Sequence, residues 1–408
     1  MHRTLLVLVV LFLSPAAGLM AAQGDGGAPP TSLTHQVVMR YASLRAIEYQ
    51  HIVAAAQQLK EDIDGFLLAP SAAGLAGVRL SWVHARRAYS PSECHRFYGG
   101  PIDEPVADLE NRINPWPIDE SYIDYVVGDP GSGIINHPEQ VPIITVPVLC
   151  VLNLHGGEKN IATGFHAIEF LLWGQGREAR GPGIRSFADY VPGPPAVARR
   201  RAYLRATAQL LVADLSQVAV QWDPARPGTF QGRFIQGDPG IALQDIFTGM
   251  SSLCGDEMAC ERMAVAYETR SMEDGQSCFS CTSLDDLIDD QAGIQATYLG
   301  RGRDGGGPSP SALVALRDAL LDQQLRAQLA DTLAALRAIP GPFASAIQGP
   351  DGSPGRVMIL AVITALEQQR RLLVSAAQRL GVVVGPGVDS DSGSRPDRSG
   401  AATGQPDD

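Results

Sequence analysis

The feature that most constrains the fold is a set of long segments in which apolar residues recur at helical spacing. Residues 34–68 carry apolar positions every three to four residues, which predicts one long amphipathic helix. Pro70 ends this helix, and Ser71 begins a second one that continues to about Tyr89. A further strongly periodic helix is expected at residues 196–222. The first half of the chain is therefore expected to be helical.

The segment 160–174 is an almost wholly apolar helix that carries His166 and Glu169. Residues three apart project from one face of a helix, close enough to share an ion or a proton. Gly164, two residues before the histidine, permits a close approach by a backbone or a ligand. A carboxylate and an imidazole in apolar surroundings need partners or an ion to offset their desolvation. The pair therefore indicates either a metal or proton site or a brace of the core.

The region 90–160 is rich in Pro, Gly, Asp and Asn, and irregular regions of this length are usually functional or poorly ordered. We favour a functional region. The prolines in 141–152 predict an extended buried loop or an interrupted helix rather than a strand. Asp103 and Asp119 lie in proline-fixed loops. Each is interpreted either as an oxygen donor or as a residue that caps a helix or forms a turn.

The Gly- and Pro-rich segment 223–240 is expected to be a linker between two domains. After it, helices are expected at 241–270, 284–298, 312–338 and 356–380. Four principal helices on each side of the linker predict an all-α protein of two packed four-helix bundles. The first domain, with long irregular loops, is expected at 34–222, and the second at 241–384.

The N-terminus is typical of an export signal. His2 and Arg3 precede an apolar run that is followed by small residues, so residues 1–22 are expected to be a signal peptide. No later segment has 18 or more unbroken apolar residues, and no transmembrane segment is expected after signal removal. Residues 23–33 are expected to be a flexible leader, and residues 385–408 a disordered tail. The sequence thus predicts a protein of the periplasm or cell envelope.

The charge of the chain argues against nucleic acid as a partner. The sequence has 32 basic and 44 acidic residues and a formal net charge of -12. It also lacks a basic stripe with interleaved aromatic residues, which nucleic-acid binding usually requires.

Six cysteines in an exported chain favour disulfides over free thiols. The candidates in the second half are Cys254, Cys260, Cys278 and Cys281. Two alternatives are a zinc site and a redox-active pair, although no βαβ pattern surrounds these cysteines.

Charged residues of the second half are further candidates. Glu257 and Glu261 are four apart, so an α-helix would place them on one face, with Arg262 and Glu268 beyond. An open metal site needs about three protein ligands, so His166 and Glu169 would require such additional groups. The alternative is a solvated charged face. Arg86 and Arg262 are expected either to bind a carboxylate ligand or to pair with buried glutamates.

The spacing of Gly164, His166 and Glu169 resembles the Gly-x-His-x-x-Glu signature of the imelysin family, also called peptidase M75, which includes iron-regulated envelope proteins. Other segments resemble family blocks in family order, at 82–89, 100–103, 112–119, 248–250, 261–269, 277–280 and 293–300. The resemblance covers about residues 31 to 384. It implies two similar four-helix bundles, with the Glu257 block beside the His166 helix in a cleft between them.

The segment 275–284 departs from this resemblance. Where many relatives carry two histidines, this chain has Gln276 and Leu284, so a metal or haem contact through those histidines is not implied here. The additional Cys281, together with Cys254 and Cys260, suggests a local disulfide staple instead.

The resulting hypothesis is an envelope metal-binding protein in iron uptake or handling, with its site in the interdomain cleft. The expected metal ligands are His166, Glu169, Glu257 and Glu261. The expected cleft or supporting residues are Gly164, Arg86, Asp103, Asp119, Arg262 and Glu268. Histidine with carboxylates suits iron(II) or zinc, and only the resemblance favours iron. The expected partners are a metal ion or an iron-containing ligand and an envelope transport protein.

Two alternatives remain open. A metallopeptidase would need a metal-activated water, but the His-Glu-x-x-His zinc motif is absent, because the order here is His-Ala-Ile-Glu. A scaffold or receptor partner would use the His166 and Glu169 pair only to brace its core.

Overall fold

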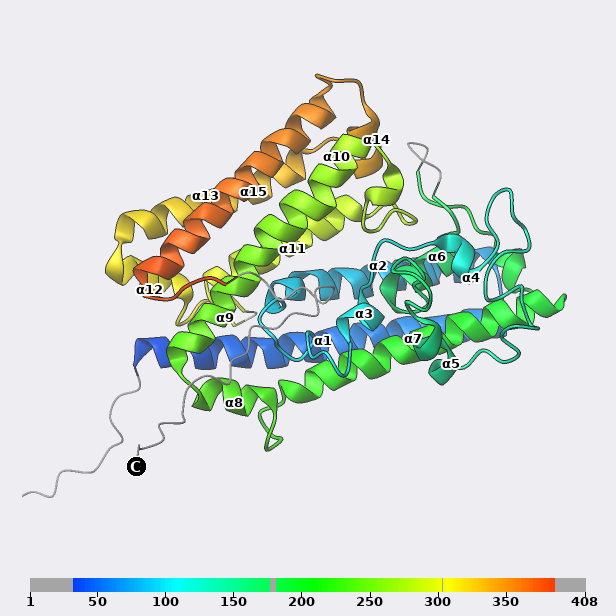
Figure 1. Cartoon of the computed structure of the whole chain (residues 1–408), viewed down its shortest axis with the longest axis horizontal. Helices are drawn as coiled ribbons and strands as arrows, with labels where there is room; N and C mark the ends of the chain where they lie inside the picture. Colours follow the sequence, from blue (N-terminus) through cyan, green and yellow to red (C-terminus); the bar gives the residue numbers. More distant parts are fainter. Residues whose placement is uncertain (1–31, 177–180, 303, 386–408) are drawn as a thin grey trace, which may run out of the picture. The chain divides into compact units, whose positions relative to one another are not determined.

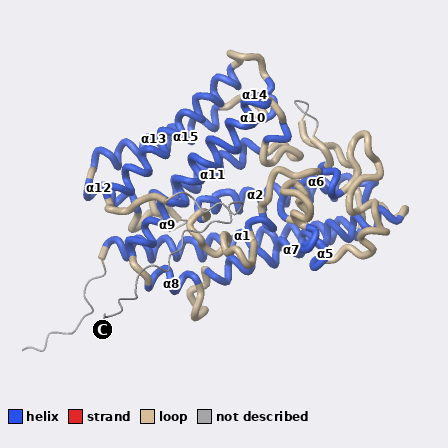
Figure 2. Tube along the Cα trace, in the orientation of Figure 1, coloured by secondary structure: helices blue, strands red, loops and turns tan. Residues whose placement is uncertain are grey.

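The described elements are helices joined by turns and loops, with two isolated backbone bridges (Figure 2). The structure is a computed structural model, which describes residues 32–176, 181–302 and 304–385. The predicted all-α class is confirmed.

Four helices of the first half pack together. They are α1 (Leu33–Leu68), α2 (Ala72–Tyr89), α6 (Gly164–Trp173) and α7 (Pro195–Gln221). α1 packs along α2 and α7, and α6 packs against α2 and α7 (Figure 1). The helical periodicity explains this, because the apolar residues of α1 recur on the faces it buries. The hydroxyl oxygen of Ser71 accepts a hydrogen bond from the Gly74 N–H at 3.1 Å and caps α2, as its position before the helix predicts.

The irregular region between α2 and α7 contains several short helices. They are η1 (Ser90–His95), α3 (Glu110–Ile113), α4 (Glu120–Ile123), α5 (Val146–Leu152) and η3 (Phe187–Tyr190). α5 matches the interrupted-helix interpretation of 141–152, since Pro147 occupies the first turn, where its missing N–H costs nothing.

The second half forms another group of helices. It comprises α9 (Pro239–Ser252), η4 (Leu253–Ala264), α10 (Val265–Thr269), η5 (Met272–Asp274), α11 (Ser283–Tyr298), α12 (Pro310–Arg317), α13 (Ala319–Ala338), α14 (Phe343–Gln348) and α15 (Pro354–Arg379). α13 packs along α15, and α15 packs along α9 and η4 (Figure 1). The single helix expected at 241–270 is thus one helical run whose central part, η4, is a π-helix.

Two boundaries differ from the sequence prediction. The helix expected at 312–338 is broken at Asp318, whose side chain accepts a hydrogen bond from the Leu321 N–H at 3.0 Å and so starts α13. The segment 223–240, expected to be a linker, contains the short helix α8 (Phe230–Gln236), which packs against α1 and α9.

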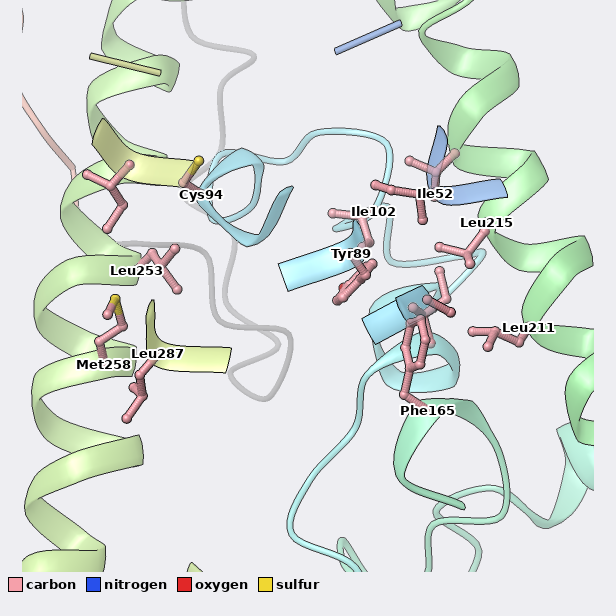
Figure 3. Packing of buried hydrophobic residues seen from close by; sticks show 14 of the residues in the cluster. Ile52, Tyr89, Cys94, Ile102, Phe165, Leu211, Leu215, Leu253, Met258 and Leu287 are labelled. Carbon is pink, nitrogen blue, oxygen red and sulfur yellow. The ribbon is translucent and has the colours of Figure 1, made fainter. Parts of the chain in front are cut away.

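The two groups of helices meet at η1. α9 and α11 both pack against this short helix, and α11 also contacts α2. α11 approaches closely because Gly293 lies on the carbonyl of Pro91, where any Cβ atom would clash. Figure 3 shows buried side chains on both sides, with Tyr89 and Phe165 in the first group and Leu253, Met258 and Leu287 in the second. The described residues from Leu33 onward cluster as one unit, and the domain division at 223–240 stays a prediction.

The predicted signal peptide at 1–22, most of the leader at 23–33 and nearly all of the tail at 385–408 lie outside the described residues. None of the described helices is long and apolar enough to cross a membrane.

Candidate functional site

His166 and Glu169 form a fully buried hydrogen-bonded pair on α6. Nδ1 of His166 lies 2.8 Å from one carboxyl oxygen of Glu169, and both side chains are 0% exposed. The other oxygen of Glu169 accepts two hydrogen bonds from Ser280, one from its N–H and one from its hydroxyl, each 2.7 Å long. Nε2 of His166 is buried and has no hydrogen-bond partner. The sequence prediction that the two side chains meet is therefore fulfilled.

Gly164 brings α6 to this position. Its φ is +84°, and a Cβ atom there would lie 2.6 Å from the carbonyl oxygen of Ile113. A glycine is therefore required at the start of α6, both for the left-handed backbone and for the close approach to α3. Trp82 of α2 supports the same turn, since its indole N–H donates to the Phe165 carbonyl at 2.9 Å.

The protonation of the pair follows from its surroundings. Burial raises the pKa of Glu169 to about 8, although the hydrogen bonds from Ser280 act in the opposite direction. Burial also lowers the pKa of His166 to about 3, and the nearby Arg86 lowers it further. At neutral pH the pair therefore holds one proton in its hydrogen bond.

A buried network of arginines and carboxyl groups lies next to the pair. Arg86 is 1% exposed and contacts Glu93 and Asp286, each at 3.2 Å. Arg262 is 3% exposed and also contacts Glu93, and it lies 2.7 Å from Asp290. Both arginines thus pair with buried acids, which was one of the two interpretations of the sequence.

Arg96 extends this network toward the solvent. It lies 3.0 Å from Glu110, 3.7 Å from Glu93 and 4.0 Å from Asp103. Burial raises the pKa of Glu110 to about 7. Arg96 lowers this pKa, and the neighbouring carboxylates raise it and so offset part of the effect of Arg96. Burial likewise raises the pKa of Asp103 to about 6. By contrast, although burial alone would raise it, the three arginines lower the pKa of Glu93 to about 2.

A polar cavity of about 610 Å³ opens at the end of this network. Its walls come from both halves of the chain, with Glu110, Trp116 and Lys159 on one side and Glu257 and Gln276 on the other. Arg96 and Arg262 also line it. The amide oxygen of Gln276 and the indole nitrogen of Trp116 are buried and lack hydrogen-bond partners. This cavity can accommodate a small polar ligand.

The π-helical winding of η4 decides which residues reach the cavity. Glu257 lies 3.1 Å from Arg262, five residues further on, and lines the cavity. Glu261, expected to share a face with Glu257, is exposed and does not line it. The cause is the i to i+5 hydrogen bonding of a π-helix, in which the N–H of Val265 bonds to the Cys260 carbonyl.

Three other predicted site residues, Asp103, Asp119 and Glu268, do not line the cavity. Asp119 caps α4, where its carboxylate accepts a hydrogen bond from the Ser121 N–H at 2.9 Å. Asp103 accepts hydrogen bonds from the N–H groups of Tyr98 and Gly100, each at 3.3 Å, and so holds a turn. Glu268 is exposed on α10. The capping and turn interpretation applies to both aspartates.

The disulfide prediction is not met by the structure. All six cysteines have free thiols: Cys94, Cys150, Cys254, Cys260, Cys278 and Cys281. Cys254 points into the second group of helices, where its thiol donates to the Leu366 carbonyl at 3.2 Å, whereas Cys260 is exposed. The two therefore face different surroundings and do not form a staple.

The four predicted metal ligands do not fit a single ion as the structure arranges them. His166 and Glu169 are bound to each other, Glu257 is paired with Arg262, and Glu261 is exposed. Among the described residues, no three His, Cys, Asp or Glu side chains gather in a way that could hold a metal. Nε2 of His166 is buried without a partner, but a single imidazole nitrogen does not make a metal site.

Several residues of this region were missed by the sequence analysis. Glu93, Asp286 and Asp290 complete the network, and Glu110 lines the cavity. Asp286 and Asp290 are four apart on α11, a spacing that marks one helix face, but only the packing of α11 on η1 shows that this face is buried. Ser280 lies in the segment 277–280, which resembles a family block, but the sequence analysis predicted no role for it.

Comparisons with known proteins agree with this architecture. The iron-regulated protein A of Synechococcus elongatus is 24% identical over 367 residues, which cover 86% of this chain and 90% of that protein. A solved iron-regulated protein A precursor from Parabacteroides distasonis has a TM-score of 0.65 at 17% identity and covers 86% of this chain and 97% of its own. An imelysin-like protein from Psychrobacter arcticum has a TM-score of 0.63 at 16% identity, with the same coverage. The profile of the imelysin family, peptidase M75, matches residues 46–373, and the chain therefore belongs to the imelysin family.

Proposed function

We propose that this protein acts in iron uptake or handling at the cell envelope and binds an iron ion or an iron-containing ligand in the polar cavity. Family membership and the iron-regulated relative support an iron-related role. The predicted signal peptide at 1–22 supports an envelope location. The observation that carries the proposal is the polar cavity of about 610 Å³, whose lining combines carboxylates with arginine and lysine side chains and includes Ile161, three residues before the helix with the family motif.

The His166 and Glu169 pair has a supporting role in this proposal. It is 0% exposed, and hydrogen bonds from Ser280 tie α6 to the loop before α11. Gln276, which lines the cavity, lies four residues before Ser280 in the same loop. The pair thus fixes the segment that forms one cavity wall.

The test is iron binding by the mature protein, beginning at residue 23. After equilibration with iron(II), ferric citrate or zinc(II) and removal of free metal, elemental analysis should find close to one iron per chain, and calorimetry should give its affinity. The variant His166→Ala should have a lower Tm without metal, because the buried Glu169 carboxyl loses its hydrogen-bond partner and a cavity is left in the core. A folded wild-type protein that retains no iron from either source would contradict the proposal.

The peptidase alternative is supported by the family description and is tested in the same preparation. A metallopeptidase should cleave a mixed peptide substrate only after metal loading, and a chelator should abolish the cleavage. A scaffold or receptor partner would neither bind iron nor cleave peptides.

A further inference from the structure

A second cavity, which we call the apolar pocket, has a volume of about 520 Å³ and is formed by α1, α2, η1, α11 and the turn after α11. It shares no lining residue with the polar cavity. Ile47 of α1 is 46% exposed and belongs to its wall, so an apolar side chain faces water in a concave surface. Such a wall can bind the apolar part of a small organic ligand. Its apolar residues are Leu44, Ile47, Ala88, Pro91, Ala292 and Ala296.

The turn after α11, which carries Arg301, is held against α1. Gly302 lies close to Leu44, because a Cβ atom at Gly302 would clash with that side chain. Arg40 of α1 donates hydrogen bonds to both carboxylate oxygens of Asp304, at 2.5 and 2.6 Å. This bidentate pair and the close packing of Gly302 fix one wall of the apolar pocket.

The charged groups of the wall leave one positive charge without a partner. Arg301 is exposed, and none of the described residues forms an ion pair or a hydrogen bond with its guanidinium group. His51 is also exposed and unpaired among the described residues, and a histidine adds no negative charge in either protonation state. The other charged residues of the wall have partners at 2.5 to 3.2 Å, and the pairs are Glu48 with Arg45, Asp304 with Arg40 and Arg87 with Asp289.

We propose that the apolar pocket binds an amphipathic organic anion, whose apolar body covers Ile47 and Ala296 and whose carboxylate pairs with Arg301. A carboxylate matches a guanidinium group in charge and can accept two parallel hydrogen bonds from it. Removing the exposed part of Ile47 from water supplies the apolar part of the binding energy. Aliphatic and aromatic carboxylic acids share this chemistry. The site goes beyond the proposed function, because the polar cavity is formed by other residues.

The test is calorimetry with octanoate, beside 1-octanol and octylammonium as neutral and cationic ligands of the same chain length. The wild-type protein should bind octanoate more tightly than either. Arg301→Gln should weaken octanoate binding by about three- to tenfold and leave octanol binding unchanged. Added salt should weaken octanoate binding to the wild type but not to this variant. Arg371→Gln on α15 is the matched control, because Arg371 is 61% exposed and does not line the pocket, and it should bind octanoate like the wild type.

Ile47→Ser tests the apolar wall and should weaken the binding of octanoate and octanol alike, by about fivefold or more. 1-Naphthoate then distinguishes the two kinds of acid, since tighter binding than octanoate would identify an aromatic body and weaker binding an aliphatic one. Iron binding should be unchanged in Ile47→Ser and Arg301→Gln, because neither residue lines the polar cavity.

Four results would overturn the proposal. The first is a folded wild-type protein that binds no octanoate and no 1-naphthoate at millimolar concentration. The second is octanol or octylammonium binding as tight as octanoate binding, which would remove the role of the negative charge. The third is an equal loss in Arg371→Gln and Arg301→Gln, which would indicate attraction by the general charge of the surface. The fourth is a loss of iron binding in Arg301→Gln, which would mean that the two sites are not separate.

Discussion

Glu257 and Arg262 lie five residues apart in the chain, and their side chains form an ion pair of 3.1 Å in the wall of the polar cavity. On an α-helix, residues five apart point about 140° away from each other. The π-helical winding of η4 removes that difference, because its hydrogen bonds join residues five apart. Such segments often occur at functional sites, and here the winding directs both side chains toward the cavity and the buried network.

Replacing Arg262 should be costly. Arg262→Met leaves Glu93 and Asp290 buried without this partner, and we expect the free energy of unfolding to fall by about 3 to 5 kcal/mol. Arg379→Met is the control, since Arg379 is 63% exposed in its pair with Asp318, and a change of about 0 to 1 kcal/mol is expected. Urea denaturation measures both, and Arg262→Lys keeps the charge if the methionine variant does not fold. Similar small losses in both variants would show that the network is not stabilising.

Gly164→Ala should destabilise the protein through two separate effects. One is the φ of +84°, and the other is the clash of a Cβ atom with the Ile113 carbonyl. Gly305→Ala isolates the first effect, because Gly305 has a φ of +98° and no atom within 4 Å of the place where a Cβ atom would lie. The control should cost about 1 to 2 kcal/mol and Gly164→Ala clearly more. Equal losses in thermal or urea unfolding would mean that α6 can move away from α3.

The His166 and Glu169 pair predicts a maximum in stability against pH. With pKa values of about 3 and about 8, the folded pair keeps one proton throughout that interval. In the unfolded chain the pKa values of the two side chains are 6.5 and 4.5. The two side chains together then hold two protons below pH 4.5 and none above pH 6.5. The unfolded state thus binds more protons between pH 3 and 4.5 and fewer between pH 6.5 and 8. The contribution of the pair is therefore largest between pH 4.5 and 6.5 and decreases on both sides.

The measurement compares the free energy of unfolding of the wild type with that of the double variant His166→Gln with Glu169→Gln, from pH 3 to pH 8. Subtracting the two curves removes the other titrating groups and should leave a bell-shaped difference. A flat difference would show that the pair titrates as it does in the unfolded chain.

The cysteines should behave as six thiols without disulfides. Alkylation of the native protein without reductant, followed by mass spectrometry, should modify Cys260 first, because it is exposed. Cys94, Cys254 and Cys278 are buried and should react only after denaturation. A peptide in which two of Cys254, Cys260 and Cys281 are joined would reject the free thiols and restore the predicted staple.

The long helices were predictable because their periodicity is a local property of the chain. Leu33–Leu68, Pro195–Gln221 and Pro354–Arg379 begin and end within two residues of the expected positions, since proline and serine mark several of their ends. The contact between His166 and Glu169 was predictable for the same reason, because residues three apart on an α-helix project from the same face.

The tertiary structure decided how the remaining groups combine. Glu257 and Glu261 share a face only on an α-helix, and the packing of η4 against α15 and α11 accompanies a π winding that the spacing does not reveal. Glu93, Glu110 and Asp290 come from separate segments. The packing of α11 on η1 brings Asp290 and Glu93 together at Arg262, and Glu110 of α3 joins them through Arg96. The sequence by itself thus determined the helices and the pair on α6. The network and the cavity depend on contacts between residues far apart in the chain, which local spacing does not encode.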